Sequence, residues 1–312
     1  MSVYTSTTQV SNVVQAAYDR YVEFALRAQP LHRGVADKRP AQLAMPGSSV
    51  TFDIYGDLAA ATATITETAN PNSVGIPNTS TVSVTLNEYG NTVTSTRKLS
   101  ALAFTDVDPA IANLVAFNMA DSIDKVVVAV AIAGTNVLYN GGATSTVTVA
   151  GTSTYAITGA IVRKANAKLR TGNAVPRLGN LFGGYIHPEV AHDLRAESGA
   201  GAWEDIRKYT DDQVGSILNG VLGVVHGCYW VETPRAYNAT DGATAARNFR
   251  TLIFGQQALA EAVAVEPGIV IGPVIDPMLR LRPISWYGLL GWSIFRQASL
   301  YRLETTSTID NS

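Results

Sequence analysis

The stretch DPAIANLVAFNMADSIDKVVVAVAIAGTNVLYNGG, from Asp108 to Gly142, contains the longest helical pattern in the chain. Asp108 is a favourable N-cap residue and Pro109 suits the first helical position. The pattern continues to about Tyr139, and the Asn-Gly-Gly that follows is typical of a helix end. About 30 residues at a rise of about 1.5 Å predict a helix of roughly 45 Å, long enough to span a domain.

Polar side chains interrupt this run in its middle (Asn118, Asp121, Asp124 and Lys125). A membrane span needs about 20 predominantly apolar residues, so the pattern predicts a long helix and not a membrane anchor. The first residues of the chain also lack the basic and then apolar pattern of a secretory signal. We therefore expect no contact with a membrane.

Two alternating segments precede the helix and predict a long β-hairpin over residues 48–98. In SVTFDIYG (49–56) and TVSVTLNEYGNTVTST (81–96), apolar and polar residues alternate with the period of a β-strand. The segment between them is rich in small and turn-forming residues. A two-stranded ribbon is marginally stable alone in water, so it needs a surface to lie on, in its own subunit or in another copy.

The first 45 residues are predicted to form an arm. Apolar residues recur at helical spacing from Val10 to Ala25, and Pro30 ends the pattern. The following LHRGVADKRPAQLAMPGS (31–48) is polar and interrupted by Pro and Gly, which predicts an extended segment with little core of its own.

Helices and strands are mixed irregularly after the long helix. The pattern predicts a short hairpin over 144–160, a helix capped by Thr158, a strand over 180–186, a short helix at 202–210, a loop at 219–227 and strands over 227–234 and 250–255. The final segment, 287–307, is mostly β-like. The helix after Thr158 has a basic face that we interpret as solvated (Arg163, Lys164, Lys168 and Arg170). Irregular mixing of this kind favours an α+β fold over a doubly wound parallel sheet.

Composition narrows the possible functions. Of the 312 residues 15% are charged, against about 25% in average soluble domains, and the net charge is −2. A low charge fraction fits a subunit that covers much of its surface with neighbours, or a β-rich protein with a Ser and Thr surface. The near-neutral chain lacks the basic stripe of a dedicated nucleic-acid binder. Cys228 is the only cysteine, so neither an intramolecular disulfide nor a Cys-rich zinc site is possible.

The most enzyme-like stretch is GYIHPEVAHDLRAE, from Gly184 to Glu197. His187 and His192 are five residues apart, which on one helix is a rotation of roughly 140° and does not aim both rings at one metal. Pro188 is expected to start a helix that leaves His187 outside it. Phosphate-loop and nucleophile-elbow motifs are absent, and Cys228 lies in an apolar strand where a buried structural thiol is expected. The sequence predicts no catalytic residue, no cofactor and no metal.

The order of these predicted segments along the chain resembles that of a known protein family. An arm, a long hairpin, a long helix, a mixed block and a closing β segment follow one another as in the major capsid proteins of tailed bacteriophages with the Hong Kong 97-type fold. Local phrases resemble the phage N-four type coat proteins of that family: GSSVTFDIYGDLAAAT, NEYGNTV, GYIHPEVAHDLR, WVETPRA, TLIFGQQAL and GWSIFRQASLYRLETTS. The resemblance covers nearly the whole chain.

The resemblance implies a non-enzymatic coat protein with five parts: an N-terminal arm (1–46), an extended hairpin loop (47–100), a peripheral domain with the long helix (101–143), an axial domain (144–250) and a closing segment (251–312). Copies would form the pentamers and hexamers of an icosahedral head, built in the host bacterial cytoplasm. The implied partners are other copies, a portal protein and packaged double-stranded DNA, held by non-specific proximity only. Separate scaffolding or decoration proteins stay open. We expect the inter-subunit contacts to include six residues: Tyr18, Tyr21, Phe52, Ile54, Tyr89 and Arg97.

One departure from the family can be read directly. Some members crosslink covalently through a lysine of the extended loop, but this sequence has no Lys or Arg from Pro46 to Thr96. We therefore expect a shell held by noncovalent contacts. Three alternatives stay open: the shell of an encapsulin-type compartment, a metal-dependent hydrolase that uses His187 and His192, and a β-structural tail or adhesin protein.

Overall fold

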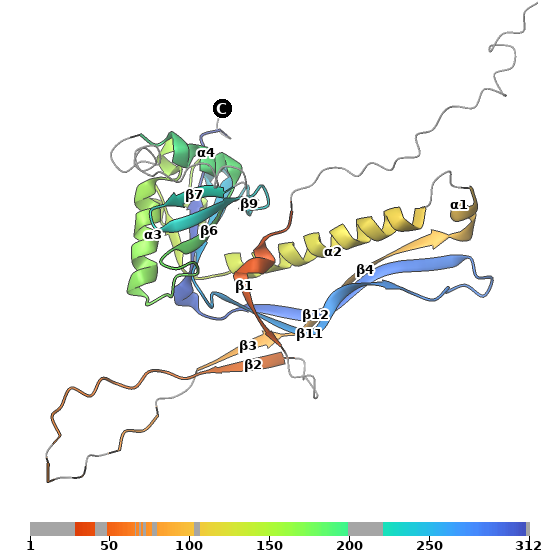
Figure 1. Cartoon of the computed structure of the whole chain (residues 1–312). Helices are drawn as coiled ribbons and strands as arrows, with labels where there is room; N and C mark the ends of the chain where they lie inside the picture. Colours follow the sequence, from red (N-terminus) through yellow and green to blue (C-terminus); the bar gives the residue numbers. More distant parts are fainter. Residues whose placement is uncertain are drawn as a thin grey trace, which may run out of the picture.

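The computed structural model describes residues 29–40, 49–65, 67–68, 70, 73–76, 80–102, 107–198 and 221–309. This part of the chain forms an elongated subunit, with a compact middle block, a long helix beside a β-ribbon, and a loop that projects away from both (Figure 1). The predicted N-terminal helix, the predicted helix at 202–210, and Tyr18 and Tyr21 lie outside the described residues. Helices and strands are both present, which confirms the α+β class.

The long helix α2 is shorter than predicted, because it ends at Ile132 (Val107–Ile132). The chain then turns at Gly134 and forms the short strand β5 (Val137–Tyr139), which pairs in parallel with β13 (Leu300–Thr305). A Cβ atom at Gly134 would lie 3.4 Å from the Leu300 side chain, and the amide of Asn136 donates to the carbonyl of Gln297 at 2.7 Å. Contacts with this distant segment override the local helical pattern.

A four-stranded sheet lies against α2. Its order is β1 (Ala36–Pro40), β11 (Leu259–Ile271), β12 (Leu281–Ile294) and β4 (Asn87–Thr96). β11 and β12 form a long antiparallel hairpin, and β1 pairs in parallel with β11. Val115 of α2 packs against Ile284 and Trp286 of β12, so one face of the sheet is covered by the helix.

The segment before β1 is more integrated than predicted. A 3₁₀ turn (His32–Val35) leads into the strand, and both His32 and Val35 are buried against the body. Arg33 reinforces the attachment through an ion pair with the buried Glu261 of β11 at 2.6 Å. The expectation of an extended segment with little core was therefore wrong for residues 32–40, because parallel pairing with β11 supplies the missing partner.

The middle block is built on a second sheet with the order β5-β13-β10-β6-β8-β7, and β9 pairs with β10. The new strands are β6 (Phe182–Ile186), β7 (Val221–Val225), β8 (Cys228–Glu232), β9 (Asn238–Ala239) and β10 (Asn248–Phe254). Helices α3 (Gly159–Thr171) and α4 (Pro188–Ala196) pack on it. Together they bury the largest apolar cluster, with the fully buried Phe182, Trp230 and Phe249 among its members.

Two local predictions in this block were wrong. The predicted hairpin over 144–160 is a pair of 3₁₀ turns (Thr146–Thr148 and Ser153–Tyr155). There the hydroxyl of Thr148 donates to the carbonyl of Ser145 at 2.7 Å, the kind of local side-chain bond that competes with strand pairing. The predicted loop at 219–227 contains strand β7, which turns at His226 and Gly227 into β8.

The hairpin is confirmed, with a break in its return strand. β2 (Ser49–Ile54) pairs with β3 (Ser80–Thr85) from Ser49 opposite Thr85 to Ile54 opposite Ser80. After Leu86 the chain leaves β2 and becomes β4 of the four-stranded sheet, then helix α1 (Arg97–Leu102). A Cβ at Gly291 would lie 2.0 Å from the Thr85 carbonyl oxygen, so the hairpin crosses β12 in direct backbone contact.

Candidate functional site

The two histidines of the enzyme-like stretch lie in different environments. His187 is the N-cap residue of α4, is 7% exposed, and packs against the Phe249 ring at 4.9 Å between centroids. Its Nδ1 accepts a hydrogen bond from the backbone N–H of Glu189 at 3.4 Å. The side chain of His192 is 60% exposed. The predicted proline start of the helix is confirmed, and the two rings do not converge on one point.

The carboxylates beside them hold other parts of the chain in place. Asp193 is buried and accepts hydrogen bonds from both the backbone N–H (2.9 Å) and the hydroxyl of Thr308. Glu189 pairs with Arg247 at 3.2 Å, and its carbonyl accepts from the hydroxyl of Ser307 at 3.2 Å. The stretch therefore anchors the C-terminal segment to α4.

The single cysteine is also structural. Cys228 is completely buried in β8, and burial raises the pKa of its thiol to about 12. A thiol in that state is a poor nucleophile at neutral pH. The described residues contain no group of three or more His, Cys, Asp or Glu side chains that could hold a metal ion. Among the same residues, no helix combines the length and hydropathy needed to cross a membrane.

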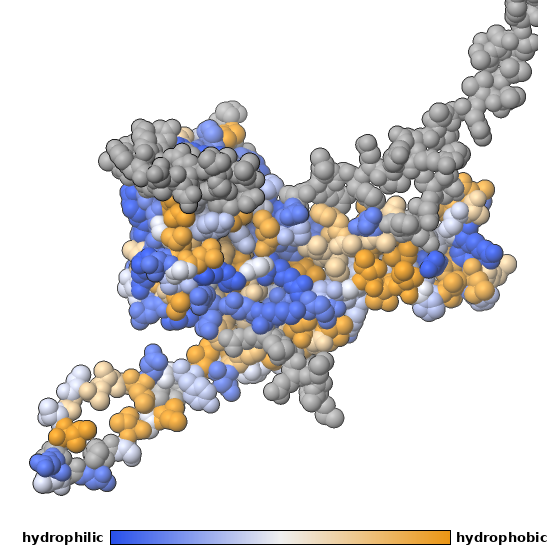
Figure 2. All heavy atoms as spheres, in the orientation of Figure 1, coloured by the Kyte–Doolittle hydropathy of each residue, from blue (hydrophilic) through white to orange (hydrophobic). Residues whose placement is uncertain are grey.

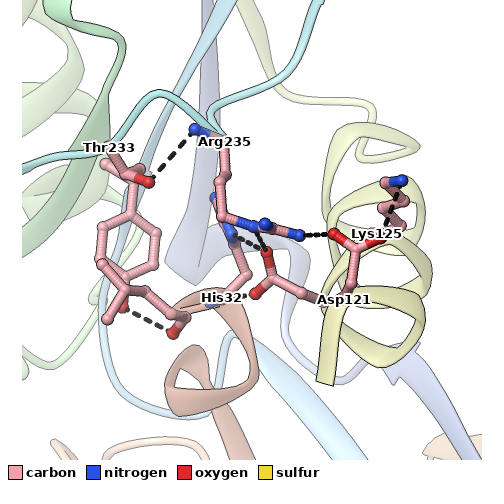
Figure 3. Close-up of polar contacts among 8 residues, drawn as sticks. His32, Asp121, Lys125, Thr233 and Arg235 are labelled. Carbon is pink, nitrogen blue, oxygen red and sulfur yellow. Dashed lines mark hydrogen bonds and ion pairs between the residues drawn. The ribbon is translucent and has the colours of Figure 1, made fainter. Parts of the chain in front are cut away.

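A buried polar bridge joins three distant segments, and the sequence did not predict it (Figure 3). Asp124 of α2 accepts from the backbone N–H of His32 at 2.7 Å, contacts the His32 ring nitrogen at 3.1 Å, and accepts from Arg235 at 3.0 Å. Arg235 also pairs with Asp121, which pairs with Lys125 at 2.9 Å. The bridge connects the N-terminal segment, α2 and the middle block. In the sequence, Asp121 and Asp124, three positions apart in a mostly apolar helix, were the feature that could have indicated this bridge.

Electrostatics favour the ionised form of the bridge. Burial alone would raise the pKa of Asp124, but the hydrogen bonds and charges of His32 and Arg235 outweigh it and hold the pKa below its ordinary value. Burial alone would lower the pKa of the Arg235 guanidinium, but its carboxylate partners Asp121 and Asp124 outweigh burial and raise it. A cavity of about 620 Å³ between α2 and the Pro234–Asn238 loop borders the bridge.

The hairpin loop has no core of its own. Every described residue between Tyr55 and Ile76 is exposed, and the large apolar side chains among them are 62–77% exposed: Tyr55, Leu58, Ile65, Val74 and Ile76. Figure 2 shows these apolar groups on a loop that stands clear of the body. Its described charges, Asp57 and Glu67, are both acidic. A monomeric protein rarely leaves so much apolar surface uncovered.

A second exposed apolar region lies at the opposite end of the subunit, on the tip of the β11–β12 hairpin and on α1 (Figure 2). We call this region the distal lobe; its exposed apolar members are Leu99, Leu102, Ile269, Val270, Ile271, Ile275, Met278 and Leu279. The same lobe carries four cations, Arg97, Lys98, Arg280 and Arg282, and one acidic side chain, Asp276, which pairs with Arg280. Its apolar and basic character complements the apolar and acidic loop.

The residues predicted to contact neighbouring subunits lie in three settings. Phe52 and Ile54 are half-buried in β2, where Phe52 packs edge-on against Phe295 of its own subunit at 6.3 Å. Tyr89 points inward and contacts the Trp292 ring at 6.1 Å. Arg97 is exposed at the start of α1. The structure does not bring these residues together. The exposed loop side chains were not predicted, because they lie in a segment without strand or helix periodicity.

The family model described as "Phage capsid protein" matches residues 7–286. A search of curated proteins gives no match. Among solved structures, the capsid of Ralstonia phage GP4 is similar with a TM-score of 0.73, 14% identity, and coverage of 95% of this chain and 96% of that chain.

Two further structures agree in fold. The capsid of cyanophage Pam1 gives a TM-score of 0.76 at 12% identity, over 99% of this chain and 100% of that chain. The head structure of Helicobacter pylori bacteriophage KHP40 gives 0.73 at 15% identity, over 98% and 99%. The structural similarity over nearly the whole chain establishes the fold, and the family match covers most of the sequence. The chain belongs to the phage capsid protein family and is a structural coat protein, not an enzyme.

Proposed function

We propose that copies of this chain form pentamers and hexamers that tile an icosahedral head around double-stranded DNA. The observation that carries the proposal is the exposed apolar loop, whose described side chains are covered by no described part of the subunit. Such a surface is stabilised by burial against a partner. Pentamers, hexamers and a DNA cargo follow the family resemblance.

The position of the two exposed regions favours head-to-tail assembly. The loop and the distal lobe lie at opposite ends of the subunit, so the loop of one copy reaches the lobe of the next (Figure 1). Head-to-tail contacts of this kind close into rings when the rotation between copies permits. In this proposal the loop reaches out from the peripheral domain and the middle block acts as the axial domain. The sheet of that block also takes in β5 and β13, from outside the bounds 144–250 that the resemblance implied.

The remaining partners complete the proposal. A portal protein would replace one ring of the shell, and scaffolding or decoration proteins would bind from either side. Packaged DNA would be enclosed without tight binding, because the chain carries a net charge of −2. Assembly would take place in the host bacterial cytoplasm and the mature protein would reside in the virion capsid.

Charge reversal tests the loop contact. The double variant Asp57→Lys and Glu67→Lys places cations against the basic distal lobe, so it should stop assembly while leaving the subunit folded. Negative-stain images of the purified chain should show closed particles for the natural sequence and none for the variant. As a matched control, Lys164→Glu changes an exposed charge on α3, outside both regions, and should assemble normally. Normal particles from the loop variant would contradict the loop contact.

Two further measurements test the class of shell. Boiling in denaturant should release a 33.1 kDa monomer band, because the loop has no lysine for a crosslink. Particles from an infected host should contain double-stranded DNA. A covalent ladder would overturn the noncovalent shell, and particles filled with a cargo enzyme would identify an encapsulin-type compartment.

A further inference from the structure

Strand β4 is an open edge of the four-stranded sheet. It pairs with β12 on one side, from Asn87 opposite Leu290 to Thr96 opposite Leu281, and with no other described strand. Apart from Tyr89 and Ser95, its ten residues are exposed. An edge of this length presents a row of backbone donors and acceptors that match any extended chain.

The hydrogen bonds show which backbone groups face outward. The N–H of Arg97 donates to the carbonyl of Arg280 at 2.8 Å. The backbone N–H and C=O groups of the odd-numbered residues of β4 therefore face β12, and those of the even-numbered residues face away from it. The N–H of Thr92 instead donates to the side chain of Asn91 at 2.9 Å, as expected for a group that points away from β12. The outward groups therefore belong to the even-numbered residues of β4: Glu88, Gly90, Thr92, Thr94 and Thr96.

The two edges of this sheet differ in their protection. The opposite edge strand, β1, is five residues long and contains Lys38, Arg39 and Pro40, residue types that discourage further pairing. β4 is ten residues long, lacks Lys, Arg and Pro, and is rich in Thr and Asn. The unguarded edge is the one suited to a partner strand.

We propose that β4 pairs with β4 of a second copy, antiparallel, across a two-fold axis at Thr92, so that two four-stranded sheets become one. This register joins outward groups to outward groups, with Gly90 opposite Thr94 and Glu88 opposite Thr96. Of the registers that join outward groups, this one pairs the most residues, because a two-fold axis at Gly90 or Thr94 would leave more of each strand unpaired. The pairing rests on the proposed function and adds a contact that the loop does not make.

A single cysteine tests the axis. In the proposed register the two Thr92 Cα atoms are roughly 5.5 Å apart, within disulfide range. Oxidised particles of Thr92→Cys should run on a non-reducing gel as a chain dimer, at twice 33.1 kDa, and revert with reductant. The native Cys228 is fully buried and does not compete. In the matched control Thr94→Cys the two Cα atoms are about 14 Å apart, so this variant should stay monomeric.

Closed particles without the Thr92 crosslink, or with equal crosslinking of Thr94→Cys, would overturn this inference and leave the proposed function standing. A Thr92→Cys thiol already protected in the unassembled subunit would also overturn it, since the chain's own residues would then cover the edge. Failure to form particles would count against both proposals.

Discussion

Phe182, Trp230 and Ile253 of the middle block are completely buried, whereas Ile65, Val74 and Ile76 of the hairpin loop are 76–77% exposed. The side chains are of the same chemical kind, and only their surroundings differ. In the block, helices α3 and α4 and neighbouring strands of the same sheet cover them within one chain. In the loop, no described residue of the chain does. Apolar residues thus stabilise the fold in one region and remain available for assembly in the other.

The largest effect should come from breaking the block. Phe182→Ala removes a fully buried ring and should lower the free energy of unfolding by about 3–5 kcal/mol. Chemical denaturation of the unassembled subunit measures this. The control Val147→Ala removes an exposed side chain in the same block, 67% exposed, and should change stability by less than about 0.5 kcal/mol. Equal losses from both variants would contradict the distinction.

The polar bridge should come next. Asp124→Asn keeps the shape of the side chain but removes the charge that faces His32 and Arg235, so unfolding should become easier by about 2–3 kcal/mol. Lys125→Gln, on the exposed side of the same helix turn, should cost less than about 1 kcal/mol. Thermal unfolding of both variants tests this order, and a larger loss from Lys125→Gln would show that the buried bridge is not the stabilising part.

Acid should weaken the same bridge. The pKa of Asp124 is lower in the folded protein than its unfolded value of about 3.9, so its ionisation stabilises the fold fully above about pH 4. That contribution disappears as the pH falls through the folded pKa. Between about pH 4 and pH 2 the unfolding temperature of the natural chain should therefore fall more steeply than that of Asp124→Asn. Parallel slopes would assign the acid sensitivity to other carboxylates.

The smallest effect on stability should come from the loop. Ile76→Ser replaces a side chain that is 77% exposed, so the unfolding free energy of the subunit should change by less than about 0.5 kcal/mol. Assembly should nevertheless weaken, which light scattering at rising subunit concentration measures. A variant that is destabilised yet assembles at the natural concentration would reverse the comparison between loop and block.

Much of the fold could be predicted from local patterns, because strand alternation and the Pro188 helix start are properties of neighbouring residues. The predictions failed where distant partners decide. β5 is a strand because it pairs with β13. His32 is buried because its backbone N–H donates to Asp124 of α2. The break of the hairpin at Leu86 depends on contact with Gly291, some 200 residues away. The assembly surfaces were missed for a related reason, since exposure depends on what the rest of the chain leaves uncovered.

The anchored C-terminal segment has a practical consequence. Thr308 is held by Asp193 on α4, so the described chain ends at Ile309 on the rim of the middle block (Figure 1). A peptide fused after Ser312 therefore starts only a few residues after Thr308, which is held in place on α4. An antibody against such a tag would recognise intact particles only if that rim faces outward. A fusion at this end would thus report which side of the shell the rim occupies, and a fluorescent cargo there would be carried inside or displayed accordingly.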